Sequence, residues 1–263
     1  MELPEEQSPL EVRSYFVRGR NALVTRAQMG DLYLDYYLHQ GQHGYQHQMK
    51  HDAMLKEALA ALVLYAASRP WNEVAAWTLH FEAEAVNLFV ASDNPRGCVV
   101  GQIFTEQVKK TGRNLFCADI VRGNHPPGRS FVEFEGGSVK GAVEWFYAQS
   151  EQRTARFFEV APEDYAMVSA QPGCEEEWIE SLTLESVQQL DALEQVSLLE
   201  RRVYRWKCSC DEKRMLDILA PVLRIDPEGL FGEELSIRMA CPRCGARYVI
   251  SKEALEAHAA ARE

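Results

Sequence analysis

Four cysteines toward the C-terminus have the spacing with the clearest chemistry in this chain. Cys208 and Cys210 are one residue apart, and Cys241 and Cys244, two residues apart, follow after residues 211–240. Two close pairs separated by a loop can surround one tetrahedral ion, and zinc accepts four such thiolates. We call these four residues the cysteine quartet and expect it to hold one Zn²⁺ in the reduced protein.

Basic residues cluster in sequence around the quartet, although the chain as a whole is acidic. Nearby cations lower thiol pKa values, which favours both zinc capture and reaction with oxidants. The same cations could instead contact phosphates, so a zinc-dependent protein that binds RNA or the ribosome is an alternative. The basic residues are Arg201, Arg202, Arg205, Lys207, Lys213, Arg214, Arg243 and Arg247.

A site of this kind has two interpretations. Zinc can be a structural staple that allows a small unit to fold, and most four-cysteine sites are inert in this way. Alternatively, oxidation of the thiolates to disulfides can expel zinc and unfold the unit. Each pair can close locally, Cys208 with Cys210 and Cys241 with Cys244, although a Cys-x-Cys disulfide is strained and labile. The spacing alone favours the structural site.

Histidines form a second candidate pattern, because His39, His43, His47 and His51 recur every four residues. On one helix they would share a face and could bind a metal ion. The two glycines among them weaken such a helix by about 1 kcal/mol each. We therefore interpret residues 40–48 as a solvated polar loop.

The other cysteines are less informative. Cys98 and Cys117 lie in apolar, strand-like runs and are expected to be buried, whereas Cys174 follows a Pro-Gly turn and is expected to be exposed. The chain contains no Gly-rich phosphate loop, nucleophile elbow or His-Glu-x-x-His motif. Without a convergent acid, base and nucleophile, we predict that the protein is not an enzyme.

Length and composition set the class of protein. The chain has 263 residues, of which 46% are hydrophobic, enough for one large and one small domain. Its formal net charge of −11 disfavours nucleic-acid partners. The first residues lack the pattern of a signal peptide, and the longest apolar run, 58–67, is shorter than the roughly 20 residues of a membrane span. We expect a cytoplasmic protein with no membrane partner, in a compartment that keeps thiols reduced.

Hydrophobic periodicity predicts an α+β fold. Apolar residues at helical spacing predict a helix over 49–68, ended by Pro70, while residues 72–136 alternate with period two and predict antiparallel strands. A run of strands flanked by helices argues against repeated βαβ units. The further elements predicted are a strand or hairpin over 14–26, helices over 30–39 and 139–149, and strands over 156–160 and 165–170.

These elements suggest three parts. Residues 1–173 form an N-terminal α+β domain of antiparallel sheet with packed helices, 174–205 an acidic helical linker, and 206–263 a small zinc-binding domain, which would be the redox-switch domain if the quartet is oxidised. The linker is predicted to be helical because apolar residues recur at helical spacing between residues 182 and 199, in a stretch with no Lys or Arg.

The order of the quartet, Cys-x-Cys before a long loop and Cys-x-x-Cys, resembles the heat-shock protein 33 family of redox-regulated bacterial chaperones. Residues 16–19 (Phe-Val-Arg-Gly) resemble the opening strand of that family. Residues 147–152 are similar to its segment that runs from an aromatic residue to Ser-Glu-Gln. The order of predicted elements also matches, so the resemblance covers nearly the whole chain. The stretch 172–208 is expected to be a shortened form of the family's linker.

The resemblance implies an ATP-independent holdase of the stress response. In that family the reduced, zinc-bound protein is inactive. Peroxide or hypochlorous acid, with mild unfolding, forms disulfides, expels zinc and unfolds the linker. The activated protein, often a homodimer, then binds unfolded or partly unfolded client proteins. The family's zinc ligands correspond here to the cysteine quartet.

A client-binding surface has no short motif, so we consider apolar linker positions that would become free when the linker melts. In the resting state they would dock on the N-terminal sheet. A constitutive binding module with a purely structural zinc is the main alternative to a switch. The candidate positions are Trp178, Ile179, Leu182, Leu190, Leu193, Leu198 and Leu199.

Overall fold

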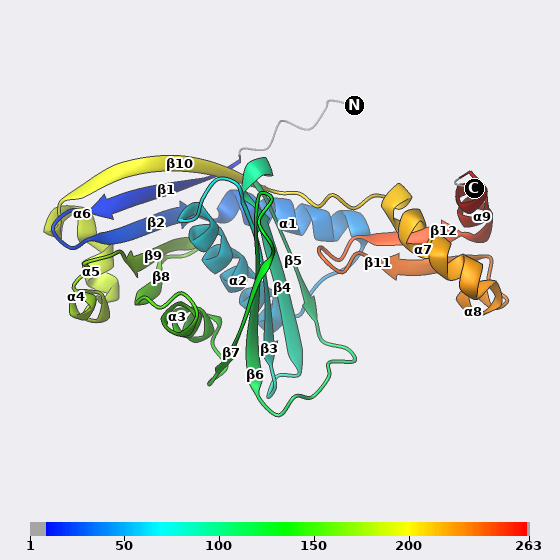
Figure 1. Cartoon of the computed structure of the whole chain (residues 1–263), viewed down its shortest axis with the longest axis horizontal. Helices are drawn as coiled ribbons and strands as arrows, with labels where there is room; N and C mark the ends of the chain where they lie inside the picture. The colour runs from blue at the N-terminus through cyan, green and yellow to red at the C-terminus, as the bar shows by residue number, and fades with distance from the viewer. Residues whose placement is uncertain (1–8, 262–263) are drawn as a thin grey trace.

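A large, mostly antiparallel sheet organises the protein, whose computed structural model describes residues 9–261. Ten strands share one continuous sheet in the order β7-β6-β3-β4-β5-β10-β1-β2-β9-β8. The sheet has two halves that face different directions, and a smaller unit projects from one end of the molecule (Figure 1). The strands are β1 Leu10–Val17, β2 Ala22–Gln28, β3 Glu73–Phe81, β4 Val86–Asp93, β5 Cys98–Phe104, β6 Asn114–Arg122, β7 Gly128–Phe134, β8 Ala155–Ala161, β9 Asp164–Ala170 and β10 Val196–Trp206.

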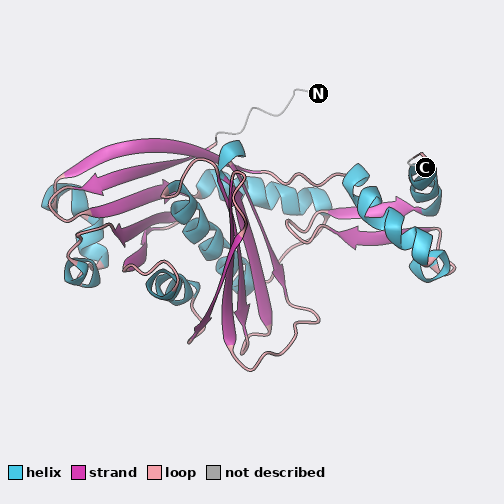
Figure 2. Ribbon diagram, viewed as in Figure 1, coloured by secondary structure: helices cyan, strands magenta, loops and turns pink. Residues whose placement is uncertain are grey.

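Helix α2 (Met49–Ala67) is the centre of the core. Each of its residues from 58 to 67 is at most 1% exposed, as expected of a helix that is apolar on all sides. Its neighbours include the fully buried Trp77 of β3 and Phe146 of α3 (Val139–Gln149). Ribbon views show α2 between the two halves of the sheet (Figures 1 and 2). The predicted α+β class is therefore confirmed.

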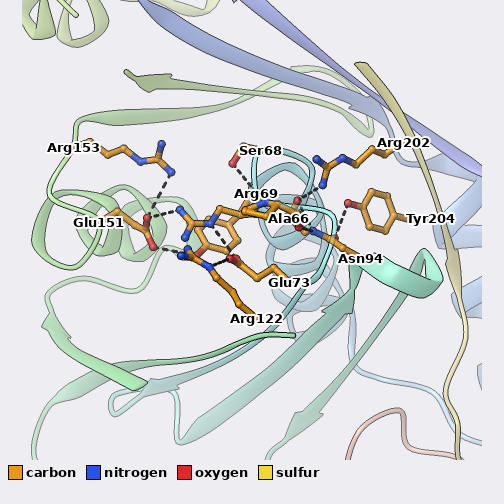
Figure 3. Close-up of polar contacts among 12 residues, drawn as sticks. Ala66, Ser68, Arg69, Glu73, Asn94, Arg122, Glu151, Arg153, Arg202 and Tyr204 are labelled. Atoms are coloured by element: carbon orange, nitrogen blue, oxygen red, sulfur yellow. Dashed lines mark hydrogen bonds and ion pairs between the residues drawn. The ribbon is translucent and has the colours of Figure 1, made fainter. Parts of the chain in front are cut away.

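A network of buried ion pairs lies at the C-terminal end of α2 (Figure 3). The side chain of Glu73 is 1% exposed and accepts hydrogen bonds from Arg69 Nε at 3.0 Å and Arg122 Nε at 2.6 Å. Arg69 Nη1 also donates to Glu151 Oε2 at 2.9 Å. A buried carboxylate is tolerated only when it is paired, so this network fixes the start of β3 against the end of α2.

Strand β10 joins the two halves of the sheet. It pairs antiparallel with β1 along most of its length and parallel with β5 at two positions, Arg205 with Cys98 and Trp206 with Val99. The junction depends on Gly97, whose φ of +59° is left-handed and whose Cβ, if present, would lie 2.6 Å from the carbonyl oxygen of Val203. Any side chain at position 97 would push β10 away from β5.

The segment between the sheet and the quartet differs from the sequence-based expectation. Three short helices precede β10: α4 (Glu176–Glu180), α5 (Leu184–Gln188) and α6 (Leu190–Leu193). The helical prediction is wrong for Val196–Trp206, which is a strand. The open edge of β1 pairs with this segment, and that tertiary contact overrides the local helical spacing.

The C-terminal unit has its own small core. Helices α7 (Glu212–Ile225), α8 (Pro227–Phe231) and α9 (Lys252–Ala260) pack on a hairpin of β11 (Ser236–Ala240) and β12 (Arg247–Ser251). Its buried residues include Met215, Ile250 and Leu255, which lie in a cluster separate from the main core. Within the part of the chain described, no helix has the length and apolarity needed to cross a bilayer.

Candidate metal centre

The fold brings the two cysteine pairs together. Cys208 and Cys210 follow the end of β10, and Cys241 and Cys244 lie in the turn of the β11–β12 hairpin. The four Sγ atoms all lie within 4.8 Å of one another, with 3.9 Å between Cys208 and Cys241 and 3.5 Å between Cys210 and Cys244. Four sulfurs at about 2.3 Å from one zinc ion would be roughly 3.8 Å apart, so the quartet has the size of a tetrahedral zinc site.

Backbone hydrogen bonds shape the second pair into a tight turn. Gly245 N donates to Cys241 O at 2.9 Å, and Cys241 N donates to Ala246 O at 2.8 Å. Gly245 has a φ of +75°, a conformation that favours glycine. Cys241 and Cys244 are 3% and 0% exposed, whereas Cys208 and Cys210 are half-buried. The first pair is therefore the more accessible to an oxidant.

Hydrogen bonds among the sulfurs set the protonation of the quartet. Contact with the Cys208 thiol lowers the pKa of Cys210 to about 7 and also lowers the pKa of Cys241. Contacts among the same sulfurs raise the pKa of Cys208 and Cys244. Tyr248 adds a 3.2 Å hydrogen bond from its hydroxyl to Cys210 Sγ. Thiolate is the form in which these four cysteines would bind a metal ion.

The basic residues expected around the quartet are only partly gathered there. Lys207 and Arg243 line a cavity of about 280 Å³ together with Cys208. Arg201 and Arg202, in contrast, form ion pairs with Glu11 and Glu200 on the sheet. The extended strand directs alternate side chains to opposite faces, so the arginines that precede Cys208 in sequence do not all reach the sulfurs.

The loop expected over residues 40–48 is shorter in the structure. His39 and His43 belong to helix α1 (Gly30–His43) and His51 belongs to α2, whereas His47 lies in the loop between these helices. Gly44, with a φ of +61°, ends α1, so a C-cap signal was present in the sequence. The four histidines do not form a metal site, since the quartet is the sole group of three or more convergent ligands within residues 9–261.

Three further cysteines lie away from the quartet. Cys98, Cys117 and Cys174 are all half-buried, so the expected exposure of Cys174 and the expected full burial of Cys98 and Cys117 are not observed. Desolvation raises the pKa of each of these thiols. At neutral pH each of them is consequently less ionised, and so less reactive, than a free cysteine.

The candidate client-binding residues fall into two groups. Ile179, Leu182 and Leu190 are buried in a second core that also contains Val24 and Phe158 of the sheet, and Trp178 is half-buried against it. The second group is exposed and consists of Leu193, Leu198 and Leu199.

Comparisons with known proteins agree on one family. Residues 159–251 match the family model described as Hsp33 protein. A curated relative, the 33 kDa chaperonin of Nitrosococcus oceani, is 26% identical over 151 residues, which cover 49% of this chain and 52% of the relative. The chain thus spans about half the length of the curated relative it matches.

The fold agrees as well. The crystal structure of the 33 kDa chaperonin (heat shock protein 33 homolog) of Thermotoga maritima superposes with a TM-score of 0.74 at 17% identity, over 97% of this chain and 99% of that one. The family model covers the linker helices, β10 and the quartet, while the structural match extends over both the sheet and the C-terminal unit. Residues 159–251 thus match the Hsp33 family model, and the chain as a whole has the fold of the 33 kDa chaperonin structure.

Proposed function

We propose that this protein is a redox-regulated, ATP-independent holdase whose resting form carries one Zn²⁺ on the cysteine quartet. The observation that carries the proposal is the convergence of four sulfurs within 4.8 Å in a chain that matches the Hsp33 family model. The site lies at the base of a C-terminal unit whose own core is small. Units of this size often depend on a metal to fold.

The four cysteines would hold one Zn²⁺, which would neutralise the thiolates and keep the two pairs together. A thiolate of the quartet attacks hydrogen peroxide to give a sulfenic acid and hydroxide, and a second thiol condenses with it to give a disulfide and water. Cys208 and Cys210 are exposed enough to react first. We assign the final disulfides to Cys208–Cys210 and Cys241–Cys244, since each pair is closely tethered along the chain.

Loss of the C-terminal unit would free the segment that precedes it. The buried residues Ile179, Leu182 and Leu190 would then become available to unfolded clients, together with the exposed Leu198 and Leu199 on β10. Among the described strands, β10 pairs with β5 only at Arg205 and Trp206, so residues 196–204 have one edge without a strand partner. An extended client could pair with that edge.

The other parts of the proposal follow from the family. Clients are unfolded or partly unfolded proteins, the oxidised form is a homodimer, and the protein acts in the bacterial cytoplasm under oxidative stress. No catalytic residue is assigned.

An oxidant titration tests the switch. Purified, reduced, zinc-loaded protein is treated with increasing hydrogen peroxide at mildly elevated temperature. Released zinc, free thiols and the suppression of aggregation of a chemically denatured client are then measured on the same samples. We expect zinc loss and client protection to rise together, and a variant with all four quartet cysteines changed to serine to show no dependence on oxidant. Zinc release without any gain in protection would contradict the holdase proposal.

One observation favours a second candidate function. Leu193, Leu198 and Leu199 are already exposed, 60%, 47% and 58% respectively, in the form with an intact quartet. A constitutive binding module with a structural zinc would use this surface in both redox states. Equal client binding by reduced and oxidised protein would identify that function.

A further inference from the structure

The N-terminal domain contacts the backbone of a quartet residue directly. The carbonyl oxygen of Cys244 lies 3.0 Å from His39 Nε2 and accepts a 2.7 Å hydrogen bond from the hydroxyl of Tyr45. His39 is in the last turns of α1, and Tyr45 follows the glycine that ends this helix. Two side chains from the first fifty residues therefore converge on one atom of the zinc-binding turn.

A second set of contacts lies three residues further along the chain. The backbone N of Arg247 donates to His43 Nδ1 at 3.2 Å, and Arg247 Nη1 donates to the carbonyl oxygen of Gly44 at 2.8 Å. The guanidinium of Arg247 also lies over the ring of Tyr45, 5.6 Å from its centroid. The contacts at Cys244 and at Arg247 thus share one surface, the C-terminal end of α1 and the residues that follow it.

The turn fits closely into this surface. A Cβ at Gly245 would lie 2.9 Å from the side chain of Gln102 and 2.9 Å from Cζ of Tyr45. Cys241 and Cys244 also pack against Ala91 and Val100 of the sheet. We use the term turn seat for two kinds of neighbour of this turn. His39, His43, Gly44 and Tyr45 make polar contacts with it, and the side chain of Gln102 lies against Gly245.

The two cysteine pairs are held differently. The second pair is buried against the turn seat and the sheet, while the first pair is half-buried and lines a solvent cavity through Cys208. Zinc can leave only when the four sulfurs separate. If the second pair is fixed to the N-terminal domain, separation requires either movement of the first pair alone or release of the turn from its seat.

We propose that the turn seat is a positioning site for the second cysteine pair, through which the N-terminal domain slows the loss of zinc. His39 and Tyr45 are positioning residues, because they bond the carbonyl of Cys244 and not its sulfur. Docking of the turn and occupancy of the quartet stabilise each other, since linkage between two equilibria is reciprocal. The inference rests on the zinc site of the proposed function, but not on holdase activity.

The test compares the full-length, zinc-loaded protein with the double variant His39→Gln/Tyr45→Phe. The matched control is Tyr37→Phe, on the same helix as His39. It removes a hydroxyl that donates to Asp52 of α2 and does not contact the quartet. The rate of zinc transfer to a chromogenic chelator is measured on two samples of protein that was reduced beforehand. One sample receives hydrogen peroxide and the other does not. We expect every protein to bind one zinc per chain, and the double variant to release it about tenfold faster, as the loss of two hydrogen bonds to one carbonyl implies. The control should release zinc at the wild-type rate.

A second variant keeps the result decisive if the double variant folds poorly by circular dichroism. Arg247→Met removes the bond to Gly44 and the contact with Tyr45 from the other side of the interface, so its zinc release should also be faster. Release at the wild-type rate by folded variants would overturn the positioning role. Because chelator transfer does not involve a client, absence of client protection would count against the proposed function and leave this inference standing.

Discussion

The hydroxyl of Tyr204 donates a 2.9 Å hydrogen bond to Oδ1 of Asn94, in a site where the two residues are 1% and 5% exposed. The amide nitrogen of Asn94 donates in turn to the carbonyl oxygens of Ala66, at 2.9 Å, and Pro70, at 3.1 Å. One buried amide therefore connects strand β10 to the end of helix α2 (Figure 3). Arg202 strengthens the same connection with a 3.1 Å bond from Nη1 to Ala66 O.

Tyr204→Phe is expected to lower the free energy of unfolding by about 1–3 kcal/mol, because it leaves Oδ1 of Asn94 buried without a donor. Urea denaturation followed by tryptophan fluorescence measures the change. If β10 restrains the switch, the variant should also reach full client protection at a lower peroxide concentration. Tyr37→Phe, at a residue 42% exposed, is the control and should change stability by less than about 0.5 kcal/mol. An unchanged midpoint for Tyr204→Phe would show that this bond does not hold the strand.

Glu73→Gln is expected to destabilise the sheet domain by roughly 2–4 kcal/mol. The substitution removes the carboxylate that Arg69 and Arg122 share, so that Arg69 keeps only its ion pair with Glu151, and breaking a buried pair is costly. The effect is reduced because the side chain of Arg122 is 45% exposed. Chemical denaturation checks the value, with Glu133→Gln as the control, whose ion pair with Arg113 is exposed on both sides. Similar losses in both variants would argue against a special role for the buried network.

Peptide mapping after oxidation should find disulfides within each cysteine pair, Cys208–Cys210 and Cys241–Cys244. In the folded quartet, close sulfur contacts run between the pairs, 3.9 Å from Cys208 to Cys241 and 3.5 Å from Cys210 to Cys244. We expect local pairing nevertheless, because the unit unfolds as zinc leaves and the short tether then determines which thiol is nearest. Mass spectrometry of a non-reduced digest separates the two outcomes. Cross-linked pairs would mean that oxidation is completed inside the folded unit.

The carboxyl group of Glu82 should become protonated only at a pH well below the ordinary pKa of a glutamate. Hydrogen bonds from His80 and from the backbone of Thr111 lower the pKa of this carboxyl from 4.5 to about 2. The folded pKa is below the unfolded one, so the stabilisation is complete above pH 4.5 and is lost as the pH falls toward 2. The stability difference between wild type and Glu82→Gln should therefore shrink below pH 4.5, and a carboxyl ¹³C NMR titration gives the pKa directly. A midpoint near 4.5 would show that these hydrogen bonds do not form in solution.

Local patterns in the sequence determined the elements that depend on nearby residues. Helix α2 followed from its apolar spacing and from Pro70, and strands β3, β4 and β6 followed from period-two alternation. The spacing of the quartet was sufficient to select four ligands that the structure brings within 4.8 Å. These features are predictable because the chemistry of a thiolate pair and the burial of one face are local properties.

Only the tertiary structure decided the features that join distant segments. The helical spacing that begins at residue 182 includes Val196 and Leu199, but both lie in strand β10 because β1, near the start of the sequence, offers a free edge. The histidines that suggested either a metal site or a loop instead meet the carbonyl of Cys244 and the backbone of Arg247. No local pattern contains these contacts, since each partner is about 200 residues away in the chain and its position is set by packing of the whole sheet. The sequence by itself thus selected the four sulfurs that the structure brings together, and the fold determined which surface holds them in place.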